Sequence, residues 1–273
     1  MAILPAEVLR MVLSELILEN DLSVLAKLSR VNHVLYKETM EVLWRNPVPK
    51  TSPDRVRVII NLLSDDDFPH IHTVLQSIRF QRTTASPLAF IRELDLTTLI
   101  RSIEMLLTSR PIETVLLMSR GHQPPMHTQI IAGIFAGIAR MKISLYKLIV
   151  REWVFPIDDA PYLQFWQPKN SSLFVNLKNV VVHGSNIKHT FFERLSEHCK
   201  ELKTLDIQLA TWHILSHLKA KSVEKEISAL TNLVKGENLE YVKIGLYDGH
   251  TEVDFLPVLG GIRKQCTVEF IRF

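Results

Sequence analysis

The chain has 273 residues, of which 47% are hydrophobic and 22% are charged, and its formal net charge is +3. This composition is that of a globular protein, and no uninterrupted apolar stretch has the length that a transmembrane helix needs. The 32 basic residues are nearly balanced by 29 acidic ones and form no continuous basic tract. We therefore expect neither a membrane nor a nucleic acid among the partners.

The cysteine content and the N-terminus bear on the cellular compartment. Cys199 and Cys266 are the only cysteines, which is too few for a disulfide framework or a zinc site. The first residues lack the basic and apolar regions of a secretion signal. We expect the protein in the cytoplasm, the nucleus or both.

The first 44 residues carry a helical apolar rhythm. Pro5 suits a first helical position, and an apolar stripe follows at helical spacing. Asp21 offers a capping side chain for a second helix, and a third apolar set ends at Trp44 before Pro47. The apolar positions of the three expected helices are Val8, Leu9, Val12, Leu13 and Leu16; Leu22, Leu25, Leu28 and Val31; and Val34, Leu35, Val42 and Leu43. Three short helices cannot bury this much apolar surface among themselves, so part of it needs an outside partner.

Four blocks of this segment, in order, resemble the divergent F-box motif of fungal proteins: Leu4-Pro5-Ala6-Glu7-Val8-Leu9, Asp21-Leu22-Ser23-Val24-Leu25-Ala26, Leu28-Ser29-Arg30-Val31-Asn32 and Val42-Leu43-Trp44-Arg45. One departure is that Asn32-His33 stand where many members have an aromatic residue. The resemblance implies a three-helix domain that binds the Skp adaptor and, through it, the cullin of a ubiquitin ligase. Carried over position by position, it places these residues on the adaptor-facing surface: Leu4, Pro5, Val8, Leu9, Leu25, Leu28 and Val31.

A different pattern begins after a proline-rich stretch. We divide the chain into an F-box-like helical domain at 1–47, a linker with a connecting helix at 48–70, and a repeat domain at 71–273. The repeated phrase is apolar, two others, apolar, one other, apolar, and it starts at Leu75, Ile91, Ile112, Leu145, Leu177, Leu202 and Leu239, with a weaker copy at Val268-Glu269-Phe270.

The repeated phrase predicts about 7–8 parallel strands, because its last two apolar positions alternate and helical segments lie between the copies. The expected helices are 101–110, 127–141, 189–200 and 211–235. Parallel strands joined by helices occur both in an open doubly wound sheet and in a curved solenoid. The phrase resembles a degenerate leucine-rich repeat, with irregular spacing and without the usual Asn in most copies, although Asn186 lies near that position in one. The expected fold class is α+β overall: a three-helix F-box-like segment followed by an α/β leucine-rich-repeat-like solenoid.

Loops at the rim of such a repeat domain are candidate binding sites. The stretch 155–168 contains Tyr162, Phe165 and Trp166, and aromatic residues in rigid loops are favoured binding anchors. We assign these three to target binding, with the alternative that they fold back onto the core.

The sequence contains no phosphate-binding loop or nucleophile elbow. His213 and His217 are four residues apart on an expected helix, a spacing that could share a metal, but no third ligand is evident nearby. We therefore expect no enzyme activity, cofactor or metal. The favoured hypothesis is a substrate receptor of an SCF-type cullin-RING E3 ubiquitin ligase. It would bind the Skp adaptor through the N-terminal helices and a protein target through the repeats. The alternatives are a leucine-rich-repeat-like scaffold without a ligase role, whose first helices cap the solenoid, and a small α/β enzyme.

Overall fold

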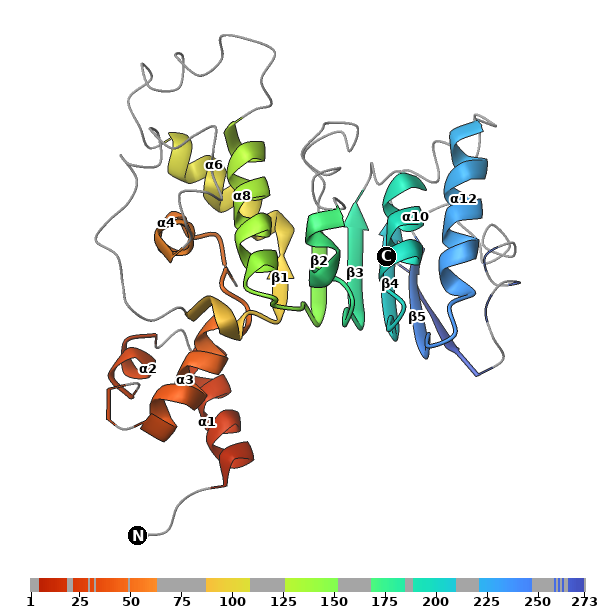
Figure 1. Ribbon diagram of the computed structural model, residues 1–273. Helices are drawn as coiled ribbons and strands as arrows, with labels where there is room; N and C mark the ends of the chain where they lie inside the picture. Colours follow the sequence, from red (N-terminus) through yellow and green to blue (C-terminus); the bar gives the residue numbers. More distant parts are fainter. Residues whose placement is uncertain are drawn as a thin grey trace.

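The computed structural model describes residues 5–18, 22–28, 30–31, 33–48, 50–62, 87–108, 126–151, 168–184, 189–209, 221–246, 258, 260, 262 and 265–272. Three helices near the N-terminus form a group at one end of a parallel sheet (Figure 1). The helices are α1 (Ala6–Leu18), α2 (Leu22–Leu28), α3 (His33–Arg45), α4 (Pro53–Leu62), α6 (Leu96–Thr108), α8 (Met126–Arg140), α10 (His189–His198) and α12 (Lys221–Val234), with short 3-10 helices η2 (Pro87–Phe90) and η3 (Pro168–Leu173). The strands are β1 (Glu93–Asp95), β2 (Lys147–Arg151), β3 (Asn179–Gly184), β4 (Thr204–Leu209), β5 (Tyr241–Leu246) and β6 (Thr267–Arg272).

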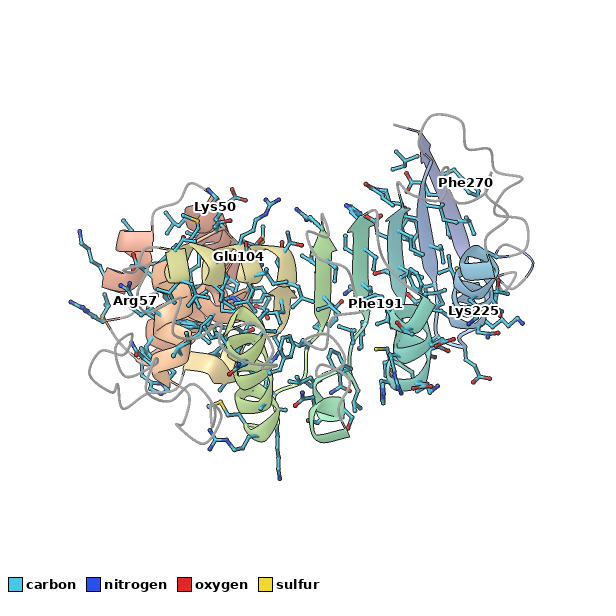
Figure 2. The ribbon with its side chains drawn as sticks, turned by 90° about the horizontal axis from the view of Figure 1, so that it is seen from above. Lys50, Arg57, Glu104, Phe191, Lys225 and Phe270 are labelled. Carbon is cyan, nitrogen blue, oxygen red and sulfur yellow. The ribbon has the colours of Figure 1, made fainter. Side chains whose placement is uncertain are left out.

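The six strands form one sheet whose order is the order of the chain, β1-β2-β3-β4-β5-β6, and every neighbouring pair is parallel. A mixed helix and strand fold with parallel strands is therefore confirmed. Two of the predicted strands, which start at Leu75 and Ile112, lie outside the described residues. The order never reverses, and crossovers of one hand then place successive connections on the same face of the sheet. Figure 2 shows α8, α10 and α12 on one side of the strands.

The register aligns the apolar positions of neighbouring strands into two buried rows that face the helices. One row runs through Leu94, Leu148, Val180, Leu205 and Val242, and the next through Val150, Val182, Ile207 and Ile244. The leading residue of five described copies is also buried, but it lies two residues before the strand: Ile91, Leu145, Leu177, Leu202 and Leu239. The alternation predicted from the phrase is present in β3, β4 and β5, whereas three consecutive residues of β2, Leu148 to Val150, are buried.

Side-chain caps define where α4 and α6 begin. Pro53 opens α4 behind Ser52, whose Oγ accepts a hydrogen bond from the Arg55 amide at 3.4 Å. Asp95 ends β1 and caps α6, since its Oδ1 accepts from the Thr98 amide at 3.1 Å. The backbone amide of Ser52 also donates to Ser102 Oγ at 2.8 Å, which joins the start of α4 to α6.

The core of the sheet region extends into the segment that the sequence predicts to be a linker. Val56, Ile59 and Ile60 of α4 belong to the continuous core, together with Trp44 and Val48. Leu13 and Leu25 are fully buried but lie outside this core. The first two helices therefore pack around a small apolar centre of their own.

Candidate functional site

An ion pair fixes how α1 is turned toward α3. Arg10 Nε donates to Glu38 Oε2 at 2.5 Å, and its Nη2 lies 3.3 Å from Glu41 Oε2. The Glu38 side chain is only 8% exposed, and its hydrogen bond raises the pKa of the Arg10 guanidinium. Leu13 is fully buried. With Arg10 and Leu13 turned inward, another side of α1 faces solvent.

That outward side of α1 is apolar. Val8, Met11 and Val12 have spacings of three and four residues, so they share one helix face, and they are 40%, 70% and 50% exposed. Val31 and Val34, at the corner between α2 and α3, are 64% and 58% exposed. We call these five residues the exposed apolar set.

The predicted adaptor-binding residues fall into three classes in the structure. Pro5, Val8 and Val31 are exposed, and Leu9 and Leu28 are partly buried. Leu4 lies outside the described residues. Leu25 is fully buried, so its side chain stabilises the packing of the helices and does not lie on an outer surface. The assignment of Leu25 to the adaptor-facing surface therefore needs correction.

Sequence reasoning missed three members of the exposed apolar set as binding candidates. Met11 was not included in the apolar stripe, and Val12 and Val34 were assigned to apolar helix faces but not to the adaptor-facing surface. The helical period shows that both sides of α1 carry apolar residues, but it does not say which side the other helices cover. Tyr162, Phe165 and Trp166, the predicted target-binding residues, lie outside the described residues.

A second candidate surface is the face of β3, β4 and β5 opposite α10 and α12, where Figure 2 shows no described helix; we call it the helix-free face. His183 Nε2 lies 3.1 Å from Asp206 Oδ1, and Lys243 Nζ lies 3.9 Å from Asp206 Oδ2. These three residues come from the adjacent strands β3, β4 and β5 and are 23 to 28% exposed. Because Asp206 is shared between two basic groups, this cluster resembles a polar contact surface more than an isolated histidine and carboxylate pair.

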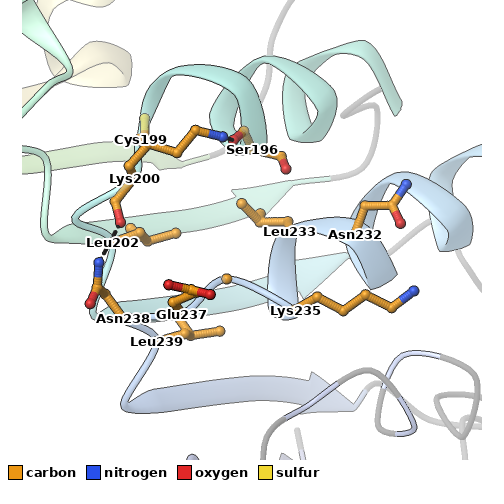
Figure 3. Close-up of a pocket in the computed structure, with 11 residues that line it drawn as sticks. Ser196, Cys199, Lys200, Leu202, Asn232, Leu233, Lys235, Glu237, Asn238 and Leu239 are labelled. Atoms are coloured by element: carbon orange, nitrogen blue, oxygen red, sulfur yellow. Dashed lines mark hydrogen bonds between the residues drawn. The ribbon is translucent and has the colours of Figure 1, made fainter.

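A cavity of about 360 Å³ lies between the C-terminal ends of α10 and α12 (Figure 3). Lys200 and Asn238 close one side, since Lys200 Nζ donates to the Ser196 carbonyl at 2.6 Å and Asn238 Nδ2 to the Lys200 carbonyl at 2.8 Å. Cys199 also lines this cavity, and burial raises the pKa of its thiol to about 12. A thiol that stays protonated near neutral pH is a poor nucleophile. The cavity therefore offers packing and hydrogen bonds, with no activated group from Cys199.

Metal sites and membrane spans were searched for over the described ranges. No group of three or more His, Cys, Asp or Glu side chains in those ranges is placed to hold a metal ion. None of the described helices combines the length and apolar character needed to cross a bilayer.

The fold defines a mixed α/β protein with one open parallel sheet and a helical group at the β1 end. No protein-family model matches the chain, and no curated protein is significantly similar to it. The function is therefore argued from the chain's own surfaces.

Proposed function

We propose that this protein is the substrate-receptor subunit of an SCF-type cullin-RING E3 ubiquitin ligase. In this proposal, helices α1 to α3 form an F-box-like domain that docks on the Skp adaptor. The sheet region is a leucine-rich-repeat-like solenoid that holds a protein target.

The exposed apolar set is the observation that carries the proposal. Nine large hydrophobic side chains are exposed in the described residues, and five of them are the members of this set, between Val8 and Val34. Exposed apolar side chains that occur together on one small group of helices make that group a candidate for contact with a partner. The four F-box-like sequence blocks imply that the partner at this surface is the Skp adaptor.

The strand order supports the solenoid part of the proposal. A doubly wound sheet reverses its direction of growth near the middle, whereas these strands follow one another in chain order. In a solenoid each unit contacts its neighbours in the chain, and the strands line one continuous surface. The helix-free face, with its polar cluster of His183, Asp206 and Lys243, is the corresponding surface for a target.

The proposed role requires no catalytic group in this chain. A receptor accelerates ubiquitin transfer by holding the target near the loaded partner enzyme, which replaces a bimolecular encounter with a local one. The residues needed are those that bind the adaptor and those that bind the target.

The test is direct binding of the purified protein to the Skp adaptor, measured by isothermal titration calorimetry. In the double variant Met11→Glu with Val12→Glu, two charges would have to be buried in the interface. We expect binding at least about 100-fold weaker, because central interface residues are each worth about 2 kcal/mol or more. Both side chains are exposed, so folding should not change.

A matched control carries the same substitutions away from the N-terminal helices. Met105 and Val175 are 50% and 54% exposed, and the double variant Met105→Glu with Val175→Glu should bind the adaptor like the unmodified protein. No binding by the unmodified protein at micromolar concentrations would favour the scaffold alternative, in which α1 to α3 only cap the sheet. Equal affinity of the two double variants would also contradict the proposed surface.

A further inference from the structure

In five described copies the second position of the repeated phrase lies on one rim of the sheet, just before the strands: Arg92, Tyr146, Lys178, Lys203 and Glu240. The Arg92 carbonyl accepts hydrogen bonds from the amides of Tyr146 and Lys147, at 2.6 and 3.0 Å. The Tyr146 carbonyl in turn accepts from the Lys178 amide at 3.0 Å, and the Lys178 carbonyl from the Lys203 amide at 2.8 Å. Arg92, Tyr146, Lys178 and Lys203 therefore stand side by side on consecutive chain segments, about 4.8 Å apart.

A cavity of about 490 Å³ opens at this rim beside the end of α8. Three of its lining residues, Arg92, Lys142 and Lys178, are cationic, and Glu201 is the one acidic lining residue in the described part of the chain. Ser144 also lines it, and the buried Oγ of Ser144 has no hydrogen-bond partner among the described residues. The lining of the cavity thus has an excess of positive charge.

Lys142 occupies a position that favours glycine. It follows α8 with a φ of 56°, and the amides of Lys142 and Ile143 donate to the carbonyls of Ala139 and Ile138 at 2.9 and 3.4 Å. This is the Schellman arrangement that ends helices, in which the left-handed residue is usually glycine because a side chain there is strained. A lysine at this position is accounted for if its side chain has a task in the adjoining cavity.

We propose that this cavity binds a phosphate group, either as inorganic phosphate or as the phosphomonoester of a small molecule. Arg92, Lys142 and Lys178 supply the charge, and a guanidinium and two ammonium groups form strong charge-assisted hydrogen bonds to phosphate oxygens. Arg92 Nη1 donates to the carbonyls of Ala89 and Ile91 at 2.9 and 2.7 Å, so the other N–H groups of this guanidinium and the two ammonium groups are the donors offered to a phosphate. The volume suits a ligand larger than a bare ion. This site is independent of the proposed adaptor surface.

The experiment is isothermal titration calorimetry of the full chain at low ionic strength with inorganic phosphate, phenyl phosphate and acetate. We expect both phosphates to bind and acetate to bind at least about tenfold more weakly, because acetate lacks the third oxygen and the second charge. Tighter binding of phenyl phosphate than of inorganic phosphate identifies a phosphorylated molecule as the ligand, and the reverse order identifies the free ion. Absence of phosphate binding at millimolar concentrations, or equal binding of acetate, would overturn the proposal.

Two variants separate binding from folding. Lys178→Ala should weaken phosphate binding about tenfold, whereas Lys225→Ala, which removes the same charge from an exposed position of α12, should leave it unchanged. Lys142→Gly should also weaken binding about tenfold while leaving the melting temperature equal or higher, since glycine adopts a positive φ without strain. If Lys142→Gly lowers the melting temperature and phosphate affinity is unchanged, Lys142 serves only the helix end and the proposal fails.

Discussion

At the scale of single residues, one buried carboxylate determines which side of α1 is available to a partner. Glu38 is nearly inaccessible and depends on Arg10 for its ion pair, so α1 cannot rotate without leaving a buried charge alone. The same rotation would bring Met11 and Val12 inward. The exposure of these apolar residues is therefore held in place by an ion pair between α1 and α3.

Cys199 gives a prediction at the same scale. Burial raises the pKa of its thiol from the ordinary value of 9.0 to about 12, and burial also raises the pKa of the partly exposed Cys266. At pH 8 the thiolate fraction of Cys199 is then on the order of 10⁻⁴, so a thiol reagent should modify Cys266 first and Cys199 only in denaturant. Mass spectrometry of the labelled protein measures this order. Equal labelling rates under native conditions would contradict it.

The same pKa shift predicts a loss of stability in alkali. Between about pH 9 and pH 12 the unfolded thiol is ionised while the folded one keeps its proton, so the folded state binds more protons and the free energy of unfolding falls as the pH rises. Urea titrations should show that Cys199→Ala loses less stability than the unmodified protein between pH 8 and pH 10, by about 1 kcal/mol.

At the scale of elements, the central strands β3 and β4 separate a buried apolar face from a partly exposed mixed face. In β3, Val182 is fully buried, whereas its neighbour Val181 on the helix-free face is only partly buried. The polar residues His183, Asp206 and Lys243 lie on that same helix-free face. A single strand thus serves both the core and the proposed target surface.

Neighbouring substitutions in β3 test this division. Val182→Thr places a hydroxyl group in the core and should lower the free energy of unfolding by about 2 kcal/mol. Val181→Thr makes the same chemical change on the other face and should cost less than about 1 kcal/mol. Chemical denaturation of both variants gives the comparison, and equal losses would show that the helix-free face is covered.

The repeated phrase predicted these strands well for a physical reason. Leu148 and Val150, Val180 and Val182, and Leu205 and Ile207 alternate because one face of each strand packs against helices. The chain direction and the order of elements followed from that pattern. The phrase did not show that its leading leucines, such as Leu145 and Leu177, lie just before the strand, because a connecting segment and a strand can both bury an apolar side chain.

At the scale of the whole molecule, the apolar interior is divided. Leu13 and Leu25 form a small centre among α1 to α3, and the continuous core extends from Trp44 through the sheet. A small centre with few buried residues opens more readily than a large one. The N-terminal helices should therefore open without unfolding of the sheet.

Native-state hydrogen exchange tests this division of stability. The amides of α1 and α2 should exchange through a partial opening of lower free energy, and those of β4 should exchange only on global unfolding. Leu13→Ala should accelerate exchange in α1 and α2 and leave β4 unaffected. Parallel acceleration in β4 would show that the two regions unfold as one unit.

The candidate sites were less predictable than the fold because their residues come from distant positions in the chain and meet only in the folded protein. Arg92, Lys142 and Lys178 are separated by tens of residues and meet only when the strands pair. Aligning the second position of each repeated phrase would have placed Arg92, Tyr146 and Lys178 in one row. Lys142 could not have been found in this way, because its contribution follows from the backbone at the end of α8.

The sequential order of the strands has a mechanical consequence. A load applied between the two ends of the sheet acts across every strand pair in turn, and each pair joins only neighbours in the chain. The hydrogen bonds between strands then break one after another, instead of bearing the load together as they do in shear. Stretching should release the sheet in small steps from an edge, so a target held on the central strands would stay bound after the outermost strand had peeled away.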